Sequence, residues 1–247
     1  MLLWNTHNPF RSCLVFDDGY CILWDYQEST YYVESNYLYI DEVRTGASMF
    51  YFAKGDKVKS AAENFSDQVG QAFKQRGKNT KKLAIDKIML DGFKSLENRD
   101  FKIENGEKIM EHARSIKSAE EIKAMRCSIS ACETSMNIME NKTKPGMTEN
   151  DIWSILHSEN IKRGGEWIET RLLSSGNRTN PWFQECGSRV LQNNEIVAFD
   201  TDLVGCYSIC TDISRTWWIG DQEPTNEMKQ DYRIALEHIQ QNAELVA

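Results

Sequence analysis

The sequence lacks the features that mark secreted, membrane-bound and nucleic-acid-binding proteins. No apolar run approaches the roughly 20 residues that a membrane-spanning helix needs, and residues 1–4 lack the basic start and long apolar stretch of a signal peptide. Basic residues are outnumbered, with 29 Lys and Arg against 37 Asp and Glu and a formal net charge of −8. Only Lys78–Lys82 clusters basic residues, and we interpret it as a solvated loop. We therefore expect neither a nucleic-acid partner nor a membrane partner.

Paired cysteine spacing is also absent. The seven cysteines are scattered, and none forms the Cys-x-x-Cys pair that is typical of a structural zinc site. An odd number of unpatterned cysteines is typical of reduced thiols, so we expect a cytoplasmic protein. The sequence has no internal repeat and no low-complexity tract, and its 247 residues suffice for one large or two ordinary domains.

Residue periodicity predicts a chain of mixed helices and strands, of the α/β (α+β) class, in two parts. The first part contains predicted strands at 13–16, 20–24 and 82–85 and within 42–52, and predicted helices at 57–76 and 90–96. A polar stretch from Gly106 onward marks the predicted boundary, which gives domains 1–110 and 111–247. The second part contains predicted helices at 119–139 and 148–164, a strand at 167–174, a hairpin at 195–218 and a final helix after 223–225, which lacks a stop signal before Ala247.

The predicted hairpin carries three acidic residues on one face. Residues two apart in a strand share a face, so Asp200 and Asp202 point the same way. A turn centred on Cys206 places Asp200 opposite Asp212, whereas a turn centred on Tyr207 places Asp202 there. Both registers bring the three carboxylates together, since cross-strand partners lie roughly 5 Å apart.

Three neighbouring carboxylates repel one another unless a proton or a cation lies between them. The alternative is that these are solvated aspartates around an ordinary turn, where Asp is common. The third carboxylate and the apolar flanks favour a metal site, and we expect Asp200, Asp202 and Asp212 to converge on one cation. Oxygen ligands suit Mn, Fe(II), Mg or Ca better than a metal that prefers thiolates, although Cys206 and Cys210 lie close by.

The order of these motifs resembles the creatinase/aminopeptidase P superfamily of metalloenzymes, with its "pita-bread" fold. The resemblance rests on Ile116–Arg126, on the Pro-Gly-Met-Thr turn at 145–148 and on Thr211–Thr216. It implies an N-terminal creatinase-like domain followed by the first half of a pita-bread catalytic domain. It also implies a small-molecule substrate, a homodimer, and two divalent metal ions per complete site, with Asp200, Asp202 and Asp212 among the ligands.

Two departures from that superfamily concern the chemistry. Its peptidases usually carry Pro-His in the loop before the hairpin, where this chain has Pro181-Trp182. An indole donates one hydrogen bond but is neither an acid nor a base near neutral pH. The Asp-x-Asp pattern at 200–202 replaces the common Asp-x-Gly. Together with Arg-Thr-Trp-Trp at 215–218, these residues resemble the iron-dependent dimethylsulfoniopropionate lyases of the DddP type.

The resemblance implies a metal-dependent lyase that releases dimethyl sulfide and acrylate, with Fe as the metal and Mn, Co or Zn as alternatives. A ring face attracts a sulfonium cation, so Trp182, Trp217 and Trp218 are candidate substrate contacts, with Phe183 beside them. Neighbouring Trp217 and Trp218 point to opposite faces, so at most one of them lines the site. The alternatives are an Xaa-Pro dipeptidase or aminopeptidase, and a non-catalytic binding module, in which Trp182 only packs.

The superfamily completes its metal site with a His and two Glu that follow the last predicted helix. We therefore expect a partial chain, inactive alone, whose remaining ligands and catalytic base lie beyond Ala247. The four histidines present are not assigned as ligands; they are His7, His112, His157 and His238.

Overall fold

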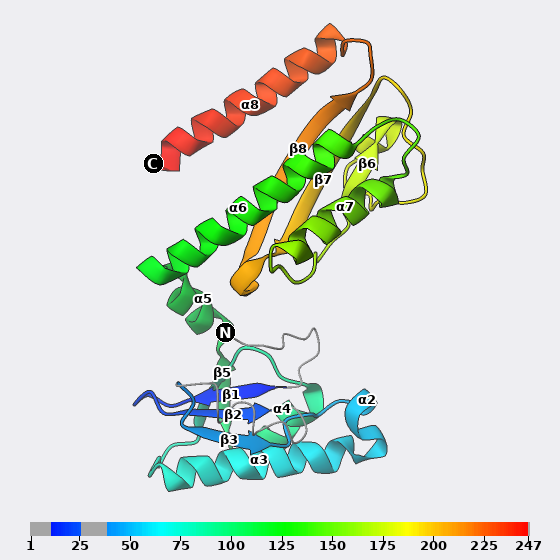
Figure 1. Ribbon diagram of the computed structural model, residues 1–247. Coiled ribbons are helices and arrows are strands. Elements are labelled where there is room, and N and C mark those ends of the chain that lie inside the picture. Colours follow the sequence, from blue (N-terminus) through cyan, green and yellow to red (C-terminus); the bar gives the residue numbers. More distant parts are fainter. Residues whose placement is uncertain (1–10, 26–38, 247) are drawn as a thin grey trace. The chain divides into compact units, whose positions relative to one another are not determined.

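The computed structural model describes residues 11–25 and 39–246, and the chain divides by contacts into two compact units, Leu2–Ile116 and Lys117–Ala247 (Figure 1). The boundary predicted at 110/111 falls inside helix α5 (Glu107–Ser115). The polar residues after Gly106 form this exposed helix and not a linker, so the chain divides only after it ends. Within the described ranges, no helix is both long and apolar enough to cross a membrane.

The first unit contains two small sheets. In one sheet, β2 (Cys21–Asp25) pairs antiparallel with β1 (Ser12–Val15) and parallel with β3 (Glu42–Thr45). In the other, β4 (Lys82–Ile85) and β5 (Lys102–Asn105) are parallel. The other elements among the described residues before α5 are helical, namely α2 (Tyr51–Lys54), the short 3-10 turn Gly55–Lys57, α3 (Val58–Gln75) and α4 (Leu90–Glu97).

Helix α3 builds the core of this unit because its apolar residues recur every three or four positions. Phe65, Val69 and Phe73 are buried, and the Phe65 ring packs edge-on against the fully buried Trp24 at a centroid distance of 5.1 Å. The Trp24 indole donates to Gln68 Oε1 at 2.7 Å, so this buried nitrogen has its partner.

The predicted strands and helices of the first unit are confirmed to within one or two residues, with two differences. The strand expected within 42–52 occupies only Glu42–Thr45, and helix α2 begins at Tyr51, before that range ends. Strand β5 was not predicted, because its sequence Lys-Ile-Glu-Asn offers a single apolar residue.

The second unit is an antiparallel sheet covered on one face by two helices. The sheet order is β6 (Leu173–Ser175), β7 (Glu195–Val204) and β8 (Cys210–Ile219). Helices α6 (Ala119–Lys142) and α7 (Glu149–Lys162) lie side by side against it (Figure 1). Short 3-10 turns at Gly176–Thr179 and Cys206–Ser208 follow β6 and β7, and α8 (Asn226–Val246) is exposed along its whole length.

Local sequence fixes the starts of helices α6 and α7. Ser118 and Glu121 form a capping box, in which the side chain of each bonds the backbone N–H of the other. Thr148 and Asp151 form a second capping box at the start of α7. The strand expected at 167–174 is regular only from Leu173 to Ser175, although the residues before it still exchange backbone hydrogen bonds with β7.

Candidate metal centre

The two faces of strand β7 have opposite environments. Val197, Phe199 and Leu203 are buried and pack in one cluster with residues of α6 and α7. The alternate residues, among them Asp200 and Asp202, are only half-buried. Period-2 alternation therefore directs one set of side chains into the core and the other set away from the helices.

The strand register brings the acidic residues together on the second face. Asp202 pairs with Asp212, and Asp200 pairs with Ser214 one step further along. The turn is thus centred on Tyr207, which is the second of the two registers expected from the sequence. Tyr207 and Ser208 both have left-handed backbone conformations, with φ of 64° and 57°.

Gly205 lies directly before the turn Cys206–Ser208. Its φ of −87° is accessible to any residue, so it does not supply the turn's left-handed conformation. A Cβ at this position would lie 2.0 Å from Ser128 Oγ of helix α6. The glycine is required because the hairpin end approaches this helix closely, where Ser128 Oγ donates to the carbonyl of Ile209 at 3.0 Å.

Two of the three carboxylates have hydroxyl partners, and none has a cationic partner among the described residues. Ser214 Oγ donates to Asp200 at 2.7 Å, and Thr170 Oγ1 donates to Asp202 at 3.0 Å. Within the described residues, none of the three aspartates forms an ion pair. Burial, the charges of Asp200 and Asp202, and a hydrogen bond with Asp200 together raise the pKa of Asp212 above its usual value.

The expected convergence of three carboxylates on one point is not found. In the part of the chain that the structure describes, no group of three or more His, Cys, Asp or Glu side chains is placed to hold a metal ion. Asp202 instead accepts a hydrogen bond from Thr170, and Asp200 accepts one from Ser214 and shares another with Asp212. The donor chemistry suits a hard divalent cation, and the assignment of these aspartates as ligands stays a prediction.

Cysteine and histidine side chains do not complete a metal site among the described residues either. Burial, followed by the charges of Glu169, Asp202 and Glu166, raises the pKa of Cys210, which disfavours the thiolate that a metal would need. His112 and His238 lie on helices α5 and α8, and His157 is half-buried on α7. His7 lies outside the described residues.

The structure separates the three candidate tryptophans. Trp218 pairs with Ile196, so it shares the aspartate face. Trp217 lies on the opposite face, where its ring packs edge-on against Phe199 at 5.6 Å, so its assignment as a substrate contact is corrected to a core position. Trp182 is half-buried in the loop that follows a cis Asn180–Pro181 bond, and its neighbour Phe183 is 79% exposed.

A buried charged network holds the loop that carries Trp182, and no local sequence pattern predicted this network. Glu149, at the start of α7, is fully buried and accepts hydrogen bonds from the amides of Ser175 and Gly187 and from Ser175 Oγ. It also pairs with Arg178. Arg189 binds Glu195 through two nitrogens, at 2.7 and 2.6 Å. These contacts fix both ends of the loop, and only the fold brings their distant partners together.

Residues 123–247 match the model of Metallopeptidase family M24. This chain belongs to that family, and the predicted membership of the creatinase/aminopeptidase P superfamily is confirmed.

Two curated relatives are similar over the whole chain. The chain is 53% identical over 251 residues to a protein of Roseobacter denitrificans named dimethylsulfoniopropionate lyase DddP, and covers 56% of it. It is 52% identical over 251 residues to a protein of Roseovarius nubinhibens with the same name, and again covers 56% of it. The chain therefore spans about half the length of the curated relatives it matches.

Solved structures share the fold at low sequence identity. A prolidase from Pyrococcus horikoshii has a TM-score of 0.71 at 17% identity, covering 92% of this chain and 59% of that one. An X-Pro aminopeptidase from Thermotoga maritima has a TM-score of 0.69 at 21% identity, covering 89% and 56%. The predicted mixed α/β (α+β) class is confirmed, whereas the expected split into a creatinase-like domain and half of a catalytic domain stays a prediction.

Proposed function

We propose that this chain is the part of a metal-dependent lyase that carries its acidic hairpin, and that the enzyme cleaves dimethylsulfoniopropionate to dimethyl sulfide and acrylate. The observation that carries the proposal is the 53% identity to a protein of that name across the whole chain. We further propose a cytoplasmic homodimer with iron as the metal. Mn, Co and Zn are the alternatives.

Asp200, Asp202 and Asp212 would hold the metal, since their carboxylates occupy one face of one hairpin. A divalent metal, when bound, supplies Lewis-acid stabilisation of the negative charge that develops on the substrate carboxylate. Trp218 shares the aspartate face and offers a ring to the sulfonium cation. We also assign Trp182 to substrate binding, and we assign no catalytic base.

The leaving group explains why Trp at position 182 is compatible with a lyase. In the elimination, the proton alpha to the carboxylate is removed, the C–S bond breaks, and its electron pair leaves with neutral dimethyl sulfide. A departing thioether needs no proton. A peptidase must protonate a leaving amine, and loss of a general acid typically costs about 10²–10⁴-fold in rate.

Two other functions remain candidates. An Xaa-Pro dipeptidase or aminopeptidase is favoured by the family's description and by the peptidases among its structural neighbours. A non-catalytic binding module is favoured by the absence, within the described residues, of a closed group of metal ligands. Under that hypothesis the acidic face binds no catalytic metal.

The test compares two proteins after loading with Fe(II). One is this chain, and the other is a chimera in which the chain is continued by the part of the Roseobacter denitrificans lyase that follows the matched segment. We expect little turnover from the chain and release of dimethyl sulfide by the chimera, with Xaa-Pro dipeptides left intact. Dipeptide hydrolysis without dimethyl sulfide would favour the peptidase, and a folded, metal-loaded chimera with neither activity would favour the module.

Replacing Trp182 by His in the chimera restores the peptidase pattern at that position. We expect no gain in lyase rate, because the elimination needs no acid there. The matched control is Phe183→His, which places an imidazole on the exposed neighbouring residue. A faster lyase reaction in Trp182→His alone would contradict the role that we give to the thioether leaving group.

A further inference from the structure

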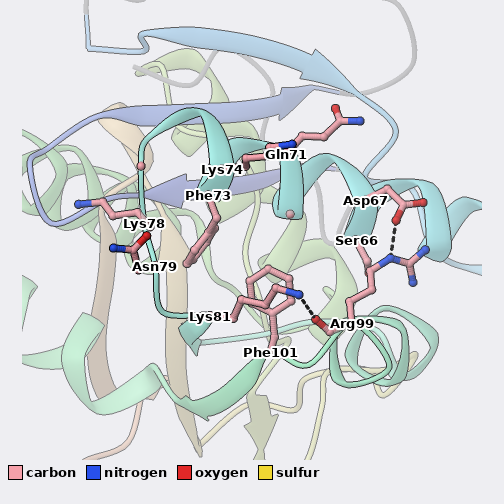
Figure 2. Close-up of a pocket in the computed structure, with 12 residues that line it drawn as sticks. Ser66, Asp67, Gln71, Phe73, Lys74, Lys78, Asn79, Lys81, Arg99 and Phe101 are labelled. Carbon is pink, nitrogen blue, oxygen red and sulfur yellow. Dashed lines mark hydrogen bonds and ion pairs between the residues drawn. The ribbon is translucent and has the colours of Figure 1, made fainter.

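The basic segment Lys78–Lys82, interpreted from the sequence as a solvated loop, borders a cleft of about 540 Å³ (Figure 2). Helix α3, the turn that follows it, and residues Arg99 and Phe101 line this cleft. Its volume lies within the range of about 300–1,000 Å³ that is typical of small-molecule sites. All of its lining residues belong to unit 2–116, whereas the aspartate hairpin belongs to the other unit.

Two aromatic rings form the apolar part of the cleft. Phe73 comes from α3 and Phe101 from the segment before β5, and both are buried. Their rings meet edge-on, with centroids 5.1 Å apart and an interplanar angle of 83°. Figure 2 shows the two rings next to each other between the basic residues. A flat apolar group that contacts this pair would be shielded from water on one side.

Positive charge surrounds the rings and is only partly neutralised. Arg99 pairs with Asp67 at 2.6 Å, and Lys78 pairs with Asp17. The Lys81 ammonium donates to the Arg99 carbonyl at 2.7 Å and lies 5.7 Å from the centroid of the Phe101 ring.

Within the described residues, neither Lys81 nor the exposed Lys74 has a carboxylate partner. The cleft is therefore a local site of positive charge in a chain whose net charge is −8. Such a site attracts anions.

Gly70 leaves one wall of the cleft open. It lies in the interior of α3, where glycine destabilises a helix. A Cβ at this position would meet no atom within 4 Å, and the backbone is not left-handed, so neither packing nor conformation requires a glycine. Ser66, one helical turn earlier, also lines the cleft, and its buried Oγ has no hydrogen-bond partner among the described residues.

We propose that this cleft binds a small organic anion, with a flat apolar body against Phe73 and Phe101 and a carboxylate or phosphate group at Lys74 and Lys81. The two rings account for the apolar part of the ligand, and the two ammonium groups without carboxylate partners account for its charge. The open wall at Gly70 provides room for the ligand. This binding site is independent of the proposed lyase reaction, because no aspartate of the hairpin lines it.

The test titrates the whole chain with four small probes and measures their binding by calorimetry or ligand-observed NMR. The test probes are two aromatic anions, phenyl phosphate and benzoate. Two control probes each carry a single feature: inorganic phosphate has the charge but no ring, and benzyl alcohol has the ring but no charge. We expect at least one aromatic anion to bind about tenfold more tightly than both single-feature probes. Equal binding of inorganic phosphate, or no detectable binding of either aromatic anion, would overturn the proposal.

Two pairs of variants locate the binding. Lys74→Gln should weaken the better probe about fivefold, whereas Lys59→Gln, which removes an exposed charge from the same helix outside the cleft, should not. Gly70→Met should fill the cleft and abolish binding while the melting temperature stays the same or rises, because Met favours a helix.

Gly70→Ala is the matched control for the filled cleft and should retain most of the binding. Unchanged binding by Gly70→Met, or equal losses for Lys74→Gln and Lys59→Gln, would place the anion elsewhere and refute the site.

Discussion

The two faces of the β7–β8 hairpin are formed by alternate residues of the same two strands, yet their environments are opposite. On one face, Phe199 and Trp217 pack against helices α6 and α7. On the other, Asp200, Asp202 and Asp212 lie together without a cation among the described residues. The first face stabilises the unit, and the second concentrates charge that a packed core would not tolerate.

Buried Glu149 shows how the same unit treats a carboxylate whose purpose is structural. It is fully buried and meets several hydrogen-bond donors together with a guanidinium. The carboxylates of the three aspartates instead form hydrogen bonds with a hydroxyl group or with one another. Incomplete satisfaction of charge therefore distinguishes the candidate site from the scaffold.

The largest expected effect separates the two faces directly. Phe199→Ala should lower the free energy of unfolding by about 3–5 kcal/mol, because it leaves a cavity beside Trp217. Asp200→Asn, one residue away on the other face, should change it by less than about 0.5 kcal/mol. Denaturant titrations of both variants measure the difference. Similar losses of unfolding free energy would refute the conclusion that only the apolar face stabilises the unit.

The next effect tests the contrast between structural and site carboxylates. Glu149→Gln should lower the free energy of unfolding by about 3 kcal/mol, because it leaves Arg178 without its buried partner. Glu185→Gln is the matched control, since it breaks an exposed pair with Arg171 and should cost less than about 1 kcal/mol. If both variants unfold at the same denaturant concentration, the network does not hold the loop.

A smaller effect should appear when metal is added to the acidic face. Without metal, Asp212→Asn should be at least as stable as the wild type, because it removes a carboxylate whose pKa is raised by burial and by its neighbours. Millimolar Mn(II) should raise the melting temperature of the wild type, and this gain should be lost in Asp212→Asn.

Asp231→Asn controls for net charge, since Asp231 is exposed on α8. An identical metal response in wild type, Asp212→Asn and Asp231→Asn would refute Asp212 as a ligand.

The smallest expected effect is a pH dependence of stability that arises from Glu159 on helix α7, away from the acidic face. Lys162 and Arg163 hold the Glu159 carboxylate and lower its pKa to about 2. A lowered carboxyl pKa stabilises the fold above the unfolded value of about 4.3, and that contribution is lost as the pH falls toward 2. Glu159→Gln should therefore flatten the stability profile in this window. An unchanged profile would show that the ion pairs do not hold Glu159 in solution.

The acidic hairpin could be predicted because its signals are local. Alternation placed Asp200 and Asp202 on one face, and the capping boxes at Ser118 and Thr148 fixed the helix starts. The register was left open between two turn centres, because local signals do not select between them; in the structure, Gly205 lies against Ser128 of a helix that is distant in sequence. The face of Trp217 was left open for the same reason, since strand alternation gives relative and not absolute orientation.

The sequence alone determined the superfamily, the order of most helices and strands, and the acidic residues of the candidate site, because these depend on periodicity, capping and motif order. Only the tertiary structure decided which residues pair, which tryptophan shares the aspartate face, and how Glu149 and Arg178 hold the loop. Only the fold, too, turned the basic residues around Lys78 into one wall of a cleft. Such contacts join residues that are far apart in the chain, and no local pattern encodes which of them will meet.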